Sequence, residues 1–167
     1  MSLQVKVLGI KKNGEPTGTL LLIMKYKQFN QELHDICDPP AREAVTRWIE
    51  MKWGLQAMPH PDKYSVDLVV HRSGKAVGYV EVEVRQPNLY QYETIHVAQR
   101  KEKLFQANLP TLFFVLTGDL THAFWTKTEF VLAAPLIEVK NTAVSQGEYF
   151  FDVPRKLFKY VDLTAPF

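Results

Sequence analysis

Residues 67–85 have the sequence DLVVHRSGKAVGYVEVEVR, and this stretch predicts a β-hairpin. Asp67 opens the first arm, an Arg-Ser-Gly-Lys segment forms the turn, and the second arm ends at Arg85. Side chains alternate between the two faces of a strand. We therefore expect the valines of the second arm to face a core, while Glu81, Glu83 and Arg85 share the opposite face.

Pairing of the two arms would bring Asp67 close to Glu81. Two carboxylates that meet at a buried position repel each other and are costly to bury. A divalent cation that prefers hard oxygen ligands, such as Mg²⁺ or Mn²⁺, relieves this repulsion. An edge hairpin with one solvated face explains the same alternation, so both interpretations stay open at this point.

The composition is typical of a globular protein. The chain has 167 residues, of which 46% are hydrophobic and 23% charged, and this predicts one domain over residues 1–167 with a substantial core. The net charge is only +2, so local patches must bind any anionic partner.

The expected location is the cytoplasm of a cell, or of a host cell if the source is viral. Cys37 is the only cysteine, so no disulfide can form within the chain, which is typical of a reducing compartment. The first ten residues alternate instead of forming an apolar block, and the apolar runs are short for a membrane span. We therefore expect neither a signal peptide nor a membrane association.

Outward from the hairpin, one helix is expected before it and a second one after it. Asp38, as N-cap, and Pro39, in the first turn, predict a helix that runs to Trp53 and stops at Gly54. The polar and apolar pattern of residues 94–108 predicts a second helix. The remaining predicted elements are an N-terminal hairpin over 1–27, a buried central strand over 112–116, a paired strand over 122–126, a short helix or loop over 129–134, an extended segment over 148–152 and a helix over 154–160.

The predicted fold class is α/β. A strand, a crossover helix and a buried strand make a βαβ unit, which is right-handed when the strands are parallel. We expect a mixed β-sheet sandwiched by helices.

This order of elements resembles that of the PD-(D/E)XK nuclease superfamily, the restriction-endonuclease-like fold. The family has a helix with a Glu, a strand with an Asp, a strand with (Asp/Glu)-x-Lys, a helix with basic or Gln residues and a buried strand. The resemblance covers about residues 38–126, and the short chain is similar to small phage-type members. The matching positions are Glu43, Asp67, Glu81, Glu83, Gln99, Arg100 and Lys101.

The resemblance implies a site of carboxylates and a bound cation. Asp67 and Glu81 would ligate Mg²⁺ or Mn²⁺, and Glu83 would ligate a second metal or act as a base. Glu43 would hold a metal-bound water, although a solvated helix Glu explains it equally. The residues expected to contact nucleic acid are Arg85, Gln99, Arg100, Lys101 and Lys103, with a further basic cluster over 155–159.

The sequence departs from the family pattern at the lysine position, which holds Glu83. Arg85 could stand for the lysine, although an arginine stays charged and is a poorer proton shuttle. Alternatively Arg100, Lys101 or Lys103 could reach back into the site from the following segment. A third interpretation is an inactive relic that binds nucleic acid.

The function expected from the resemblance is metal-dependent hydrolysis of phosphodiester bonds in DNA, endo- or exonucleolytic. The expected partner is DNA, branched and single-stranded forms included, and a homodimer is compatible with the family. The alternatives are an inactive nuclease-like module that binds nucleic acid or a protein, and an interaction protein with an accidental Glu-x-Glu. The last predicts that Asp67 and Glu81 lie too far apart to share an ion.

Overall fold

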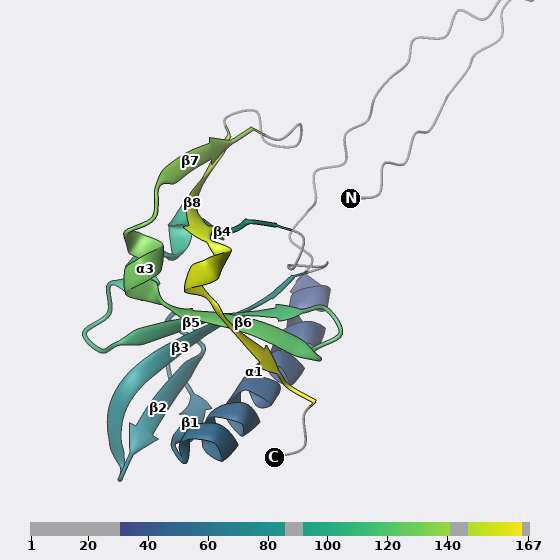
Figure 1. The fold of residues 1–167 in the computed structure, drawn as a ribbon. Helices are drawn as coiled ribbons and strands as arrows, with labels where there is room; N and C mark the ends of the chain where they lie inside the picture. Colours follow the sequence, from purple (N-terminus) through teal and green to yellow (C-terminus); the bar gives the residue numbers. More distant parts are fainter. Residues whose placement is uncertain (1–30, 86–91, 141–146, 165–167) are drawn as a thin grey trace, which may run out of the picture.

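A computed structural model describes residues 31–85, 92–140 and 147–164, with the backbone alone for residues 31–38 (Figure 1). The predicted hairpin over 1–27 lies outside the described residues. Within them, helices and strands form one large sheet, one small sheet, one long helix and several short helices. The class is therefore α/β with a mixed sheet, as expected.

The large sheet has six strands in the order β1-β2-β3-β5-β6-β9. Its centre is β3 beside β5, the parallel pair, and the other neighbours are antiparallel. The predicted strands over 112–116 and 122–126 are confirmed as β5 and β6. The bounds are β1 Gln56–Pro59, β2 Leu68–Arg72, β3 Lys75–Arg85, β5 Thr111–Thr117, β6 His122–Lys127 and β9 Lys159–Asp162.

The predicted hairpin over 67–85 is confirmed as β2 and β3. Ser73 and Gly74 both have positive φ, 50° and 76°, which suits a two-residue hairpin turn. Val80 is fully buried on one face of β3, with Val82 and Val84 packed against the same core. The alternation therefore places the charged side chains of β3 on the other face.

One face of the large sheet is covered by α1, Gln31–Trp53. Ala41, Val45 and Ile49 of this helix are fully buried, because they recur at helical spacing against the sheet. The predicted stop is confirmed: Gly54 has φ 63° and its N–H donates to the carbonyl of Glu50 at 3.0 Å.

The predicted start of this helix is wrong. The helix begins at Gln31 and contains both Pro39 and Pro40. A proline lacks an N–H and disfavours helix in the preceding residue, which made Asp38 a natural boundary. Here the two prolines are exposed and the helix continues through them, packed on the sheet by the residues that follow.

The opposite face of the large sheet is covered by a second, three-stranded sheet of order β4-β8-β7. Phe113 and Val115 of β5 point into this second core, whereas Phe114 and Leu116 point toward α1. The expected sandwich of helices is thus wrong on this side, where a sheet takes their place with only short helices. The bounds are β4 Thr94–Ala98, β7 Leu136–Val139, β8 Glu148–Pro154, η2 Gln99–Lys101, α2 Glu102–Phe105, α3 Thr128–Leu132 and η3 Arg155–Leu157.

The predicted helix over 94–108 is therefore largely wrong. Residues 94–98 form β4, because Ile95 and Val97 alternate into the second core and pair with β8. Only the short η2 and α2 helices follow. The segment over 148–152 is extended as predicted, whereas over 154–160 only η3 is helical and the chain then enters β9.

Among the described residues, no helix is both long and apolar enough to cross a bilayer.

We expect Phe114→Ala to lower the free energy of unfolding by about 3–5 kcal/mol. Phe114 is fully buried, and its ring centroid lies 5.8 Å from that of Trp48 and 6.0 Å from that of Trp125. Urea unfolding followed by tryptophan fluorescence measures the change. The matched control is Phe130→Ala, since Phe130 is 41% exposed. Equal losses in both variants would contradict this packing.

Candidate functional site

The candidate site lies on the charged face of β3. Glu81 and Glu83 are opposite Phe113 and Val115 in the parallel register of β5, at the margin of the second core. Glu81 is only 6% exposed, which is unusual for a glutamate. A buried carboxylate requires a charged or hydrogen-bonding partner.

Lys101 supplies that partner. It ends η2, in the crossover between β3 and β5, and its side chain reaches back to β3. Its Nζ donates to Glu81 Oε1 at 2.5 Å and lies 3.5 Å from Glu83 Oε2. Of the three basic residues expected to reach the site from this segment, Lys101 is thus the one that contacts its carboxylates.

Asp67 joins the same group from the residue before β2. Its Oδ2 accepts a hydrogen bond of 2.8 Å from the N–H of Val82, so the carboxylate lies beside the peptide that follows Glu81. Its Oδ1 lies 3.6 Å from Arg42 Nη1 of α1. On the other side, Arg85 Nε donates to Glu83 Oε1 at 2.6 Å.

We call these six residues the charge cluster: Arg42, Asp67, Glu81, Glu83, Arg85 and Lys101. It contains three carboxylates and three cations, contributed by α1, the hairpin and η2. Asp67 and Glu81 interact, because the negative charge of Asp67 contributes to the raised pKa of Glu81. That the two share an ion stays a prediction.

Burial raises the pKa of Glu81 to about 7. The positive charge of Lys101 opposes this rise, and the negative charges of Asp67 and Glu83 add to it. Burial also acts on Glu83, but Arg85 and Lys101 outweigh it and lower the pKa of Glu83. The pKa of Lys101 is raised because Glu81 and Glu83 outweigh its burial. The Glu81 carboxyl is therefore poised to exchange a proton near neutral pH, whereas the Glu83 carboxyl is held ionised by its two cations.

The carboxylates of the cluster allow a Mg²⁺ or Mn²⁺ ion that keeps several water ligands, but not an ion coordinated by protein atoms alone. Among the described residues, no group of three or more His, Cys, Asp or Glu side chains is arranged to hold a metal ion. Mg²⁺ is often bound by only one or two carboxylates, with water and substrate phosphate as further ligands. All three carboxylates of the cluster already have partners. A bound ion would therefore share or replace one of these contacts.

The structure does not bring Glu43 into the cluster. Its side chain is 67% exposed and lies 3.4 Å from Arg47, one turn further along α1. Successive helix residues point about 100° apart, so the preceding residue, Arg42, faces Asp67 instead. Arg42 was not expected at the site. The four-residue spacing of Glu43 and Arg47 is typical of an exposed ion pair, which would have pointed Glu43 away from it.

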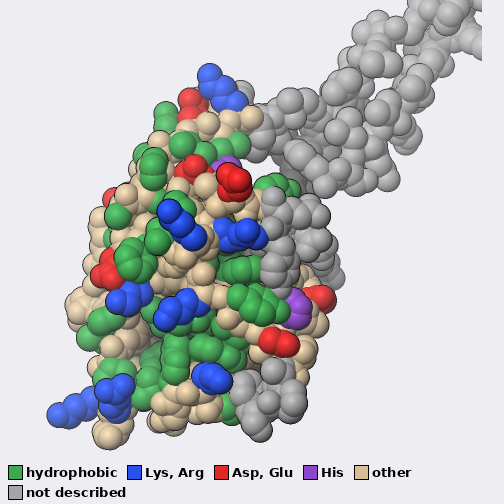
Figure 2. Space-filling view, in the orientation of Figure 1, with side chains coloured by type: hydrophobic (Ala, Val, Ile, Leu, Met, Phe, Trp, Pro, Cys, Tyr) green, Lys and Arg blue, Asp and Glu red, His purple; other side chains and the backbone are tan. Residues whose placement is uncertain are grey.

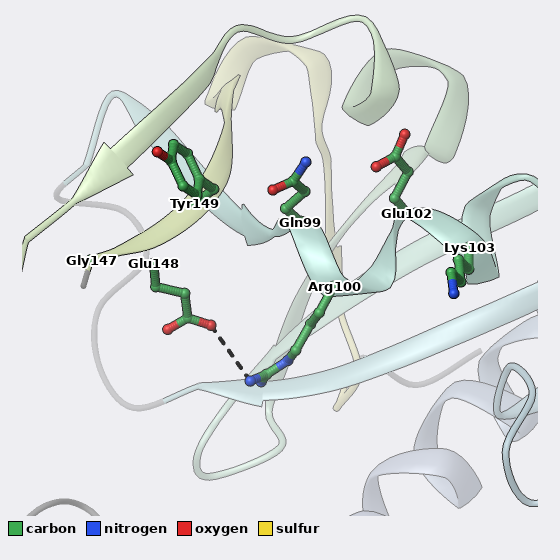
Figure 3. A pocket seen from close by; sticks show the side chains of 7 residues that line it. All are labelled: Gln99, Arg100, Glu102, Lys103, Gly147, Glu148 and Tyr149. Carbon is green, nitrogen blue, oxygen red and sulfur yellow. Dashed lines mark hydrogen bonds and ion pairs between the residues drawn. The ribbon is translucent and has the colours of Figure 1, made fainter. Parts of the chain in front are cut away.

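The other expected nucleic-acid contacts divide between two places. Arg85 lies in the charge cluster, whereas Gln99, Arg100 and Lys103 line a shallow, open hollow of about 410 Å³ (Figure 3). Its opposite wall is the start of β8, with Glu148 and Tyr149. We call this the η2–β8 hollow.

The basic cluster over 155–159 lies elsewhere, on η3 and β9. Figure 2 shows Lys and Arg side chains among hydrophobic ones on the face where β6 and η3 lie. Lys159 Nζ stands 4.9 Å from the ring centroid of Trp125, and Lys127 pairs with Glu129 at 3.3 Å. These are ordinary surface contacts that leave the positive charges accessible to an anionic partner.

Comparison with known proteins adds no family: no family model matches the chain, and no curated protein matches it either.

We expect the free energy of unfolding to fall as the pH rises from about 5 to about 8, by up to about 3 kcal/mol. The folded pKa of Glu81 lies above its ordinary 4.5, so protonation favours the folded state. This contribution is complete below pH 4.5 and is lost as the pH rises through about 7. Urea unfolding at each pH measures it. The lowered pKa of Glu83 acts in a separate window, below 4.5.

Glu81→Gln should remove this part of the pH dependence, whereas the exposed control Glu43→Gln should retain it. The five histidines are present in all three proteins, so the difference between the profiles isolates Glu81. Parallel profiles for wild type and Glu81→Gln would contradict a raised pKa of the buried Glu81 carboxyl.

Proposed function

We propose that this protein is a metal-dependent nuclease that hydrolyses phosphodiester bonds in DNA, built on a restriction-endonuclease-like core. The observation that carries the proposal is the position of Lys101, whose Nζ lies 2.5 Å from Glu81 and 3.5 Å from Glu83. The sequence resemblance lacked only a lysine, because Glu83 occupies its position. A lysine from the adjacent η2 turn would restore the set of Asp, Glu and Lys.

The arrangement of elements supports the same proposal. An Asp before one hairpin strand, a Glu in the next and a parallel buried strand beyond a crossover follow the family order. In this chain Asp67, β3 and β5 occur in the same order, and β3 pairs with β5 in parallel, which supports the proposal. The long crossover carries the lysine, although it contains a strand and short helices where the family pattern has a helix.

Asp67 and Glu81 would hold a Mg²⁺ or Mn²⁺ ion. Such an ion, when bound, lowers the pKa of a coordinated water and neutralises charge on the phosphoryl group. Lys101 would place its ammonium group beside the phosphoryl oxygens, where negative charge develops. Glu83, braced by Arg85, would hold Lys101 in position, so we assign Glu83 to positioning and not to metal binding.

The protonation of Glu81 links this function to pH. A carboxyl must be ionised to ligate a cation. Because the pKa of Glu81 is about 7, cation binding should strengthen as the pH rises through neutrality.

A second candidate function is supported by the charge balance of the cluster. Three cations already face its three carboxyls, so with all six groups ionised the cluster is neutral without any added ion. This arrangement suits an inactive nuclease-like module, in which the charges stabilise the fold and a separate surface binds nucleic acid. It predicts DNA binding without cleavage.

We expect purified protein to cut plasmid or single-stranded DNA with Mn²⁺ or Mg²⁺ and not with EDTA. Asp67→Asn and Lys101→Met should each reduce the rate by about 10²–10³-fold, the usual effect of removing one electrostatic contributor. The matched control, Lys75→Met, should cut at close to the wild-type rate, because Lys75 is an exposed lysine at the hairpin turn, at the other end of β3 from the charge cluster.

Circular dichroism and urea unfolding of each variant separate lost chemistry from lost folding. Metal-dependent cutting that survives Asp67→Asn would refute the assignment of that residue. No cutting by the wild type under any of these conditions would overturn the nuclease proposal and favour the inactive module.

A further inference from the structure

The η2–β8 hollow adjoins the charge cluster through one short turn. Lys101 points to the cluster and is 15% exposed at its side chain, whereas Arg100 is 77% exposed and lines the hollow. Neighbouring residues of a 3₁₀-helix point about 120° apart. The η2 turn therefore directs Lys101 into the charge cluster and Arg100 into the hollow, so the two sites share one short segment of chain. Because Arg100 and Lys101 are consecutive residues of η2, a strand bound beside Lys101 would run along the turn toward the hollow.

The lining of the hollow combines a ring with polar groups. Tyr149 presents an aromatic ring that is 48% exposed, next to the amide of Gln99 (Figure 3). Arg100 and Lys103 add two cations. An exposed ring with cations beside it suits a base and the phosphate joined to it. The volume of about 410 Å³ lies in the range of small-ligand sites.

The two carboxylates of the hollow have partners within it or beside it. Glu148 lies 3.5 Å from Arg100. The two residues are each two positions beyond Ala98 and Phe150, the last pair of the β4–β8 ladder, and so they lie opposite one another. Glu102 accepts a hydrogen bond of 3.2 Å from Gln106. The Arg100–Glu148 pair is exposed and long, so its contribution to stability is small and a phosphate can replace Glu148 at little cost.

The chemistry favours single-stranded over duplex DNA. A ring such as that of Tyr149 can stack only on a base that has left its own stack. In a duplex the bases are stacked and paired, so Tyr149 would meet only a groove edge or the backbone.

We propose that the η2–β8 hollow is a nucleotide subsite for single-stranded DNA, in which Tyr149 stacks on a base and Arg100 and Lys103 contact its phosphate. The choice of DNA as the ligand rests on the proposed function. The subsite adds Tyr149 of β8, which lies outside the part of the chain that the sequence resemblance covers.

The test is fluorescence anisotropy of a labelled 12-nucleotide oligothymidylate in EDTA, where no metal-dependent cutting interferes. Tyr149→Ala should weaken binding by about 5- to 100-fold, the usual effect of removing one stacking ring. Tyr149→Phe keeps the ring and should bind within about twofold of wild type. A duplex of the same length should show little change between the three proteins.

The matched control is Tyr160→Ala, because Tyr160 is similarly exposed, at 50%, but lies on β9 beside the basic cluster. Its binding of the oligonucleotide should equal that of wild type. The subsite is overturned if the wild type does not bind the oligonucleotide, if Tyr149→Ala binds as well as wild type, or if it loses duplex binding equally. A loss confined to Tyr160→Ala would place the contact on β9 instead.

This test is independent of the nuclease assay. Tyr149-dependent binding without cleavage in Mn²⁺ would retain the subsite and overturn the nuclease. Metal-dependent cleavage with an unchanged KM in Tyr149→Ala would retain the nuclease and overturn the subsite.

Discussion

The ion pair between Lys101 and Glu81 joins the two sheets at the candidate site. Glu81 belongs to the large sheet, and Lys101 ends the turn that leaves the small one. Both side chains are mostly buried, and removing one partner from such a pair leaves a buried charge unmatched. The pair therefore holds the η2 turn against β3, between the charge cluster and the hollow, beside the apolar core that also joins the two sheets.

Strands β3 and β5 lie side by side, but they carry different side chains on the face that turns away from α1. The face of β5 that turns toward the small sheet is apolar, with Phe113 and Val115, and it forms a core. The same face of β3 carries Glu81 and Glu83, so charge begins where that core ends. Poor solvation at this margin raises the pKa of Glu81 and strengthens each interaction between charges. A site of this kind needs a nearby core, because the same residues in water would titrate normally.

The sequence predicted the parts of the fold that depend on local patterns. The turn at Ser73 and Gly74, the alternation of β3 and the buried strand β5 all follow from neighbouring residues. Strand β4 could not be predicted in this way, because its partner β8 lies far along the chain and the helix formers after Ala98 extended an apparent helix. At the site, a difference of one or two positions along the chain decided which side chain points inward. Arg42 faces Asp67 where Glu43 was expected, and Lys101 alone among three basic candidates reaches Glu81. Helical rotation sets such choices, and it is fixed by packing that a sequence pattern does not specify.

The parallel pairing of β3 with β5 also has a kinetic consequence. The β2–β3 hairpin closes through a two-residue turn, whereas β5 can join β3 only after the intervening chain, with β4 and two short helices, has been placed. Pairings between residues distant in sequence form slowly, because loop closure precedes any gain from contact. We therefore expect the hairpin to form early and the central pairing to limit the folding rate. Until that step is complete, the carboxylates of β3 remain in water, and the site acquires its electrostatic character only at the end of folding.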